Sequence, residues 1–363
     1  MRDGAAGGAR HLAALAREPR PAGGDAEERA RRYAEQVLDE AGFGITREPF
    51  SWSAFPGRYA TPLGGGIAAL TIFAAAGIGL TRDSGYPSLA VLAVGLLVLA
   101  AFAQSMLGDA VLSLPLMRET GANVVATRDG LPPRVWLVAH LDSKSQPVPS
   151  LLRVVGVMML VSALVLAVIA AVLQLASLPH RMIWVLAVVD AVLGAVPVVA
   201  SVVGARSPGA LDNASGVAAV LSAAQVLDPD AAVGVLLTSA EELGLAGARA
   251  WARAHAPGVA LNCDGVDDEG EVTIMHGSNP PIEIIDALRR ATGGSVRVRR
   301  MPLGLLTDSV ALADRGWRTV TVSRGSLASL QRVHTPADSL GRLRGTGIDD
   351  TATVLARAAE ALS

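Results

Sequence analysis

The chain has 363 residues, a formal net charge of −2 at pH 7, and 51% apolar but only 4% aromatic residues. This length allows one large domain or two ordinary ones, and the near-neutral charge gives no reason to expect a nucleic-acid partner. The lone cysteine, Cys263, excludes an intrachain disulfide.

The N-terminal quarter of the chain begins without the long apolar core of a secretory signal, so we expect a disordered polar leader over residues 1–25. Residues 26–41 (AEERARRYAEQVLDEA) repeat apolar side chains at helical spacing and predict an amphipathic helix. Residues 45–52 then predict a strand, with residues 123–128 as its partner.

Four long apolar runs interrupt this pattern: residues 63–80, 89–107, 154–178 and 182–203. Each is close to the roughly 20 residues that cross a bilayer core, and none contains Lys or Arg. The links within each pair, residues 81–88 and 179–181, are short enough to force antiparallel hairpins. Helices buried in a soluble core normally keep a polar stripe, which these runs lack. We therefore predict an integral membrane protein with two transmembrane hairpin insertions, over residues 63–115 and 149–205.

Asp190 is an acid inside the fourth apolar run. An ionisable residue in a membrane helix is a candidate for a functional role. The alternative is that Asp190 faces the neighbouring hairpin or a wet cavity, and the sequence leaves its role open.

The remainder of the chain alternates strands with helices once the two insertions are set aside. Strands are predicted at residues 134–141, 233–238 and 259–263, and helices at residues 209–226, 246–254 and 348–362. This alternation predicts an α/β fold with a mainly parallel central sheet covered by helices. We assign residues 26–62, 116–148 and 206–363 to this one domain.

Residues capable of binding metal follow the ends of these strands, where open α/β sheets place their ligand sites. Two imidazoles and three carboxylates are candidates: His140, Asp212, Glu242, Asp264 and His334. This donor set suits Zn²⁺ or a similar divalent ion. One bridging carboxylate can hold two cations, which together clamp the attacking oxygen and the carbonyl oxygen of a substrate.

Two further acids adjoin these candidates. Asp142 lies two residues after His140 and could accept its ring N–H, which would fix the imidazole tautomer. Glu241 precedes Glu242, so one glutamate can bind metal while the other takes a proton from the attacking water. Each feature alone also fits an ordinary surface or helix cap, Thr335 or Asp338 included. Their joint occurrence, each on its expected element, favours a catalytic site.

Six motifs occur in one order along the chain: AHLDS, GALDNASG, SAEELGLAG, NCDGV, LLTDSVALADRG and HTPADSL. Together they resemble the M28 family of zinc peptidases. The resemblance implies two divalent ions, most simply Zn²⁺, with metal ligands His140 and Asp264 for one, Glu242 and His334 for the other, and Asp212 as the bridge. It implies Glu241 as general base and Asp142 as the residue that orients His140.

The sequence departs from the family pattern at four places. The second hairpin separates the AHLDS and GALDNASG motifs, and the first hairpin interrupts the early strand connection. Val333 stands where some members have a tyrosine that steadies the oxyanion, and Ser309 stands where many members have histidine.

The resemblance implies an aminopeptidase that removes N-terminal residues from peptides by metal-activated water attack. Two alternatives stay open: a peptidase-like membrane scaffold with weak or no activity, and a carboxypeptidase or other amidohydrolase that uses the same site. Because the second hairpin begins and ends near candidate ligands, we expect the cleft to lie close to the bilayer and the peptide substrate to be membrane-proximal.

The sequence also bears on sidedness but leaves the oligomeric state open. Basic residues on the domain side of the hairpins outnumber those in the hairpin turns: Arg58, Arg118, Lys144, Arg153 and Arg206 against Arg82 and Arg181. The positive-inside tendency therefore places the peptidase domain in the cytoplasm.

Overall fold

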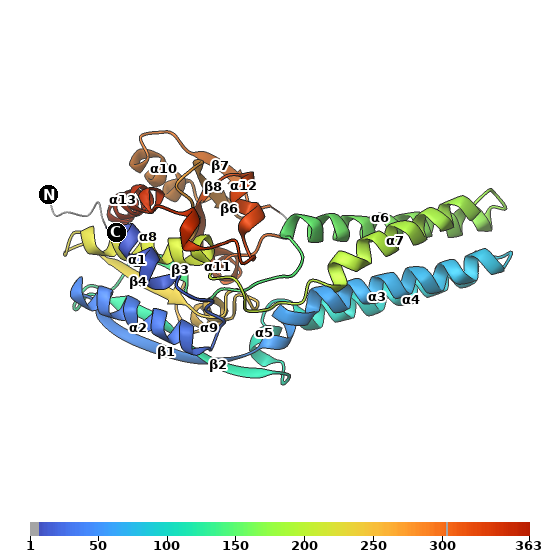
Figure 1. Cartoon of the computed structure of the whole chain (residues 1–363), viewed down its shortest axis with the longest axis horizontal. Helices are drawn as coiled ribbons and strands as arrows, with labels where there is room; N and C mark the ends of the chain where they lie inside the picture. The colour runs from blue at the N-terminus through green and yellow to red at the C-terminus, as the bar shows by residue number, and fades with distance from the viewer. Residues whose placement is uncertain (1–6, 303) are drawn as a thin grey trace. The chain divides into compact units, whose positions relative to one another are not determined.

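The computed structural model describes residues 7–302 and 304–363, which divide into two compact units. The sheet unit comprises the chain up to Ala54, Leu112–Ser145 and Ala205–Ser363. The helical unit comprises Phe55–Val111 and Gln146–Gly204. Figure 1 shows the strands gathered in the first unit and long helices in the second.

The sheet unit contains an eight-stranded sheet in the order β1-β2-β4-β3-β5-β8-β6-β7. Its strands are β1 (Gly44–Ser53), β2 (Arg118–Thr127), β3 (Val135–His140), β4 (Val233–Thr238), β5 (Val259–Val266), β6 (Glu271–His276), β7 (Arg297–Arg300) and β8 (Arg318–Gly325). The four central strands are parallel, and antiparallel strands β2 and β6 flank them. The predicted α/β class is confirmed, including the pairing of β1 with β2.

Helices cover both faces of this sheet because successive strand residues point to opposite sides. On β3, Val135 and Leu137 enter the larger core, while Trp136 and Val138 enter the smaller one. The larger core is covered by α1 (Gly7–Leu15), α2 (Asp25–Glu40), α8 (Ser215–Val226), α10 (Ile282–Ala291) and α13 (Thr346–Leu362). The smaller core is covered by α9 (Ala246–Ala254) and α11 (Asp308–Ala313).

The described part of the predicted leader, residues 7–25, is ordered, which differs from the expectation of a disordered segment. Leu12 and Leu15 on α1 are buried in the larger core, and His11 Nδ1 lies 2.7 Å from the hydroxyl of Tyr33. Helix α1 has only nine residues, and most of them are alanine or glycine. Its apolar residues are therefore too few to show a helical period in the sequence. Residues 1–6 lie outside the described residues.

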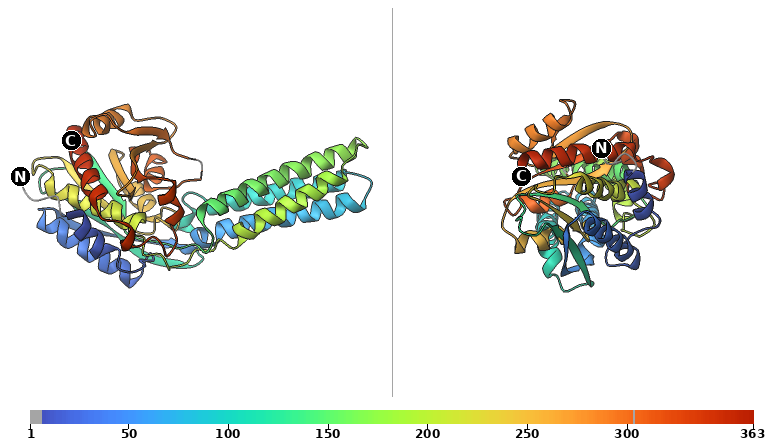
Figure 2. Two further views of the ribbon diagram at one scale, coloured as in Figure 1. Left: turned by 45° about the horizontal axis from the view of Figure 1, so that its top comes forward. Right: turned by 90° about the vertical axis from the view of Figure 1, so that its left-hand side faces the viewer.

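The helical unit contains α4 (Tyr86–Met106), α6 (Ser150–Leu175), α7 (Arg181–Val199) and all but the first residue of α3 (Ala54–Thr81). The short α5 (Ala110–Ser113) is divided between the two units. The four long helices run side by side (Figure 2). By length and composition each can cross a membrane, with mean hydropathies of 1.9 to 2.8.

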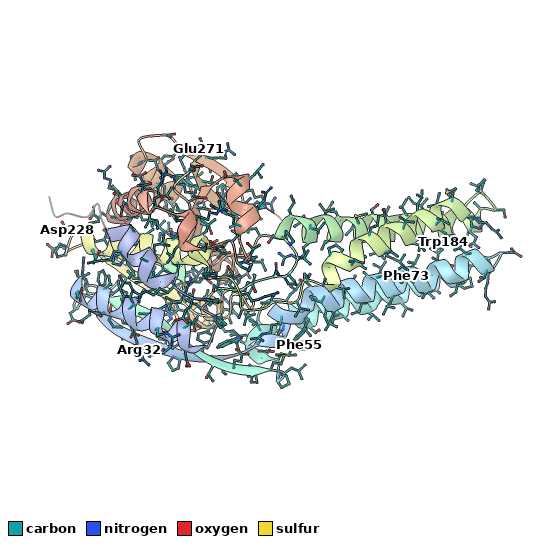
Figure 3. All side chains as sticks on the ribbon, viewed as in Figure 1. Arg32, Phe55, Phe73, Trp184, Asp228 and Glu271 are labelled. Atoms are coloured by element: carbon teal, nitrogen blue, oxygen red, sulfur yellow. The ribbon has the colours of Figure 1, made fainter. Side chains whose placement is uncertain are left out.

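The packing of the helical unit uses small side chains, so the large ones face outward. Ala163, Ala167, Ala187 and Ala191 are fully buried around Trp184. Leu97 on α4 and Met158 on α6 are instead 71% and 64% exposed. Carbon side chains cover the long helices (Figure 3), where Phe73 and Trp184 are labelled. An outer surface this apolar is typical of helices that face lipid or another protein.

Candidate active site

His140 is the last residue of β3, and its ring is almost fully buried. Nδ1 lies 3.1 Å from the backbone carbonyl of Asp142, to which it can donate. That hydrogen bond would leave the lone pair on Nε2, which faces Asp212 Oδ1 at 3.2 Å, Asp264 Oδ1 at 3.7 Å and Glu241 Oε2 at 3.9 Å. An imidazole held in this way is ready to ligate a cation.

Asp212 lies between two imidazoles, with one carboxylate oxygen directed at each. Its Oδ1 faces His140, and its Oδ2 lies 3.0 Å from His334 Nε2. His334 Nε2 is also 3.3 Å from Glu242 Oε2. Two clusters result, His140 with Glu241 and Asp264, and Asp212 with Glu242 and His334, each with its ligand atoms within 4.8 Å of one another.

The structure thus brings together all five predicted metal ligands and Glu241, from the ends of three parallel strands and two loops. The backbone at Ala240, just before Glu241, and at His334 is left-handed, with φ of 55° and 64°. Such backbone conformations are costly for residues other than glycine and tend to gather at functional sites.

The ring N–H of His140 lies within hydrogen-bond distance of the Asp142 backbone carbonyl and not, as the sequence had led us to expect, of the Asp142 carboxylate, which binds other groups. The carboxylate oxygens of Asp142 accept the backbone N–H groups of Glu241 and Glu242 at 3.0 and 3.1 Å, and its Oδ1 lies 3.6 Å from His140 Nδ1. One buried carboxylate therefore fixes the loop that carries both glutamates and also stands beside the imidazole.

Two positioning residues were not recognised as such in the sequence. Asp338 accepts the backbone N–H groups of Leu211 and Asp212 at 2.6 and 3.1 Å. Asn213 donates to the carbonyl of Cys263 at 2.9 Å and accepts from Gly216 and Gly265, which ties the loop to the end of β5. Both residues lie within the motifs, but most of these contacts join residues 50 or more positions apart in the chain.

Lys144 was also missed, although it is the only lysine of the chain. Its Nζ lies 2.6 Å from Glu242 Oε2, the same oxygen that faces His334. The side chain is only 17% exposed, so this ammonium is part of the site and not of the surface.

Opposing charges set the protonation of these groups. Burial raises the pKa of Glu241 well above its ordinary value, helped by the carboxylates of Glu242 and Asp264. Burial would also raise the pKa of Glu242, but the ammonium of Lys144 and then His334 outweigh it and lower that pKa to about 2. The two adjacent glutamates therefore differ in pKa: Glu241 is ready to accept a proton, whereas Glu242 is ionised.

The pKa values of the two imidazoles are raised, whereas burial alone would lower them. Burial lowers the pKa of His140, but the carboxylates of Glu241, Asp142 and Asp212 outweigh it and raise the pKa well above 6.5. The pKa of His334 is raised too, because Glu242 and Asp212 outweigh burial and Lys144.

The side chains present fit a pair of divalent cations. His140 Nε2 and Glu242 Oε1 are buried and have no hydrogen-bond partner among the described residues, which is costly unless another group binds them. The carboxylates of these clusters also outnumber the cationic side chains beside them. Carboxylates this close repel one another, and a bound cation would relieve the repulsion. Nitrogen and oxygen donors in this number are the ligands that Zn²⁺ accepts.

We expect metal affinity to fall as the pH falls. A cation must displace the protons from His140 and His334, whose pKa values are raised in the metal-free protein. Each displaced proton should weaken apparent binding by about tenfold per pH unit below the imidazole pKa. Zinc titration calorimetry at several pH values tests this, and an affinity independent of pH would contradict it.

The contribution of the two histidines to the stability of the metal-free protein should instead increase as the pH falls. A raised histidine pKa contributes stability that is complete below the unfolded value, near 6.5, and is lost as the pH rises through the folded value. Denaturant unfolding in the presence of chelator should therefore show this contribution from His140 and His334 declining with increasing pH.

Arg20 holds the backbone on both sides of the second insertion. Its guanidinium donates to the carbonyls of Leu141 at 2.8 Å, Pro208 at 2.6 Å and Gly209 at 3.1 Å, and also to that of Leu15. Leu141 directly follows His140, and Gly209 shortly precedes Asp212. The side chain is 1% exposed, so these carbonyls have no ready access to water.

Arg20→Ala should lower the free energy of unfolding by about 3 kcal/mol or more, because each orphaned buried carbonyl costs roughly 1–3 kcal/mol. Zinc affinity should fall as well, and Arg20→Lys should not restore it because an ammonium lacks the guanidinium fork. Denaturant titration and calorimetry measure both quantities, with exposed Arg32→Ala as the control. A variant with unchanged stability and zinc affinity would contradict this.

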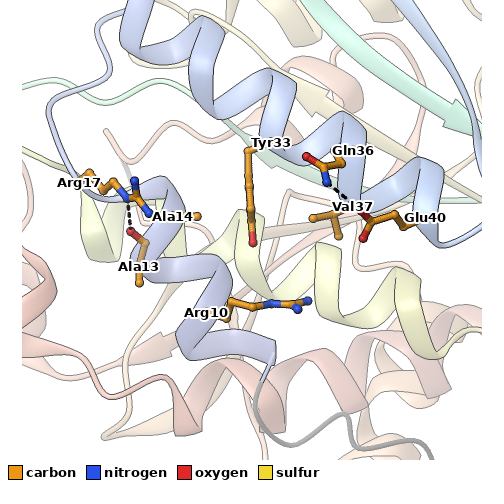
Figure 4. Close-up of a pocket in the computed structure, with 8 residues that line it drawn as sticks. All are labelled: Arg10, Ala13, Ala14, Arg17, Tyr33, Gln36, Val37 and Glu40. Carbon is orange, nitrogen blue, oxygen red and sulfur yellow. Dashed lines mark hydrogen bonds between the residues drawn. The ribbon is translucent and has the colours of Figure 1, made fainter.

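A cavity of about 430 Å³ lies elsewhere in the sheet unit, between α1 and α2 (Figure 4). Its lining includes Arg10, Arg17, Tyr33 and Glu40. None of the predicted site residues lines it, so it does not belong to the candidate metal site.

The fold resembles that of solved enzymes across nearly the whole chain. The aminopeptidase from Aneurinibacillus sp. strain AM-1 matches with a TM-score of 0.56 and 15% identity, over 98% of this chain and 92% of that one. BSAP, a zinc aminopeptidase from Bacillus subtilis, matches at 0.55 and 14%, over 98% and 94%. Porphyromonas gingivalis glutaminyl cyclase matches at 0.57 and 12%, over 98% and 96%.

Sequence comparison gives the family. No curated protein sequence matches the chain. The model of peptidase family M28 matches residues 123–359, which include every residue of the candidate site from His140 to His334. The chain therefore belongs to peptidase family M28.

Proposed function

We propose that the protein is a two-metal exopeptidase that removes N-terminal residues from peptides. The observation that carries the proposal is the placement of Asp212 between His140 and His334, at 3.2 and 3.0 Å, with Glu241 beside the first imidazole. A carboxylate with one oxygen toward each imidazole is the arrangement that two adjacent cations require.

In this proposal the ligands divide between two cations, most simply Zn²⁺. His140 and Asp264 would hold one cation, Glu242 and His334 would hold the other, and Asp212 would be shared by both. When bound, the pair would polarise the scissile carbonyl and lower the pKa of the attacking water. The zinc aminopeptidase among the similar structures supports this choice of metal.

Glu241 is the proposed general base. Its backbone N–H is held by Asp142, and its raised pKa suits a group that first accepts a proton and then releases it. It would take one proton from the attacking water and deliver it to the amine that leaves when the peptide bond breaks. Proton count is then balanced, and Glu241 returns to its starting state.

A peptide-library digest read by mass spectrometry, with and without chelator, tests the reaction. We expect successive loss of N-terminal residues that chelator abolishes and zinc restores. Trimming from the C-terminus would instead support a carboxypeptidase on the same site. Cyclisation of N-terminal glutamine would support the activity named for the glutaminyl cyclases that share the fold.

We further propose that α3, α4, α6 and α7 span a bilayer and that the peptidase domain lies in the cytoplasm. The apolar outer surface of the four helices supports the first statement, and the distribution of basic residues, lysine included, supports the second. Accessibility labelling of a cysteine placed at Ser84, in the link between α3 and α4, distinguishes the two orientations. Faster cleavage of membrane-tethered peptides than of soluble ones would support a membrane-proximal substrate.

A further inference from the structure

Asp190 and Ser162 form a polar pair in the middle of otherwise apolar helices. Asp190 lies halfway along α7, and Ser162 lies halfway along α6. The hydroxyl of Ser162 donates to Asp190 Oδ2 at 2.8 Å. Ser162 is the one hydrogen-bond partner that the described residues give Asp190, so Oδ1 remains available to a further group.

This pair lies outside the packed seam of the helical unit. The buried face of α7 carries Trp184, Ala187 and Ala191, whereas Asp190 is only half-buried and Ser162 is exposed. The side chains around the pair are exposed and aliphatic: Met158, Val161 and Val165 on α6, and Leu186 and Leu193 on α7. The outer face of α6 and α7, defined by these residues with the polar pair at its centre, has no covering element among the described residues.

If the helices span the bilayer, as proposed above, the pair lies at the level of the lipid chains. A carboxyl group facing lipid at that depth is costly, and the aspartate side chain is too short to reach the interface. Polar side chains in membrane helices usually meet a partner across a helix interface. The outer face of α6 and α7 therefore requires a partner that can hydrogen-bond at mid-depth.

We propose that this partner is a second copy of the chain, related by a two-fold axis. The outer face offers a donor and an acceptor at the same depth, which makes it self-complementary as a two-fold interface requires. Asp190 Oδ1 of one copy can share a hydrogen bond with Ser162 Oγ of the other, and the two-fold axis generates a second, identical bond. The aliphatic side chains around the pair would pack against their counterparts.

Full-length protein in lipid nanodiscs tests the proposal by mass and by cross-linking. Cys263 is buried, so a single cysteine introduced at Leu193 reports on the outer face of α6 and α7, and one at Leu97 on α4 is the matched control. We expect dimers that cross-link through Leu193→Cys and not through Leu97→Cys. Asp190→Leu should weaken dimerisation at least tenfold, whereas Asp190→Asn, which keeps a donor and an acceptor, should preserve it.

Three results would overturn the inference: a monomeric wild-type protein, dimerisation unaffected by Asp190→Leu, or cross-linking of Leu193→Cys to a different protein. Extraction of the chain from membranes at alkaline pH would remove its premise and overturn it too. Peptide hydrolysis is measured in parallel. An inactive dimer would contradict the proposed reaction alone, and an active monomer would contradict the interface alone.

Discussion

Glu241→Gln should lower kcat for peptide hydrolysis by about 10²- to 10⁴-fold, the usual contribution of a general base. Glutamine keeps the shape of the side chain but cannot accept a proton from water. Asp142 would still accept the backbone N–H of residue 241, so the loop should keep its conformation. The cations should remain bound, because in the proposed site Glu241 is not a metal ligand.

The measurement combines steady-state kinetics with metal analysis of the same purified sample. Glu271→Gln, at an exposed acid on β6, is the matched control and should leave both quantities unchanged. A Glu241→Gln enzyme with near wild-type kcat would contradict the role of base. Loss of metal from that variant would instead indicate that Glu241 is a ligand, as its proximity to His140 and Asp264 also allows.

The strands that carry the site could be predicted because their sequences are short, apolar and followed directly by polar residues. Residues 233–238 match β4, and the segment 134–141 differs from β3 by one residue at each end. Strands β6, β7 and β8 were not predicted. β7 is largely arginine (RVRR), so its pairing with β6 rests on backbone hydrogen bonds and carries no apolar signal.

The ligands could be predicted by type and order, whereas the residues that hold them could not. The guanidinium of Arg20 donates to backbone carbonyl groups, which every residue type carries, so the sequence does not identify its partners. Lys144 belongs to no recognisable pattern in the sequence, and it is its distance of 2.6 Å to Glu242 Oε2 that places it in the site. These contacts join segments far apart in the chain, and only the folded sheet unit brings them together.

The second insertion is compatible with a rigid site because its two ends are joined inside the sheet unit. The hydroxyl of Ser143 donates to the carbonyl of Ser207 at 3.0 Å, and Ser145 Oγ accepts the N–H of Arg206 at 2.9 Å. Loop-closure cost grows only slowly with loop length, so a long insertion between fixed ends is tolerated. The spacing of His140 and Asp212 is then set by these bonds and by Arg20, independently of how many residues lie between them.

Asp212→Ala should have the largest effect on metal binding, because among the described carboxylates Asp212 directs one oxygen at each imidazole. Replacing residues that merely orient a ligand typically costs about 10–100-fold in affinity, and we expect the loss here to exceed that range for both cations. Hydrolysis should fall to background. Zinc titration and metal analysis after gel filtration provide the measurement, and Asp286→Ala, at a half-buried acid on α10, is the control.

Asp212→Asn distinguishes the bridge from a simple terminal ligand. The amide keeps one oxygen, so a terminal ligand would retain most of the affinity of its single cation. A bridge must present two anionic oxygens, since Oδ1 lies 3.2 Å from His140 Nε2 and Oδ2 lies 3.0 Å from His334 Nε2. We therefore expect the asparagine variant to bind one cation and lose the other. Two cations held by Asp212→Ala at wild-type affinity would refute the bridged site, and with it the assignment of two ligand pairs around Asp212.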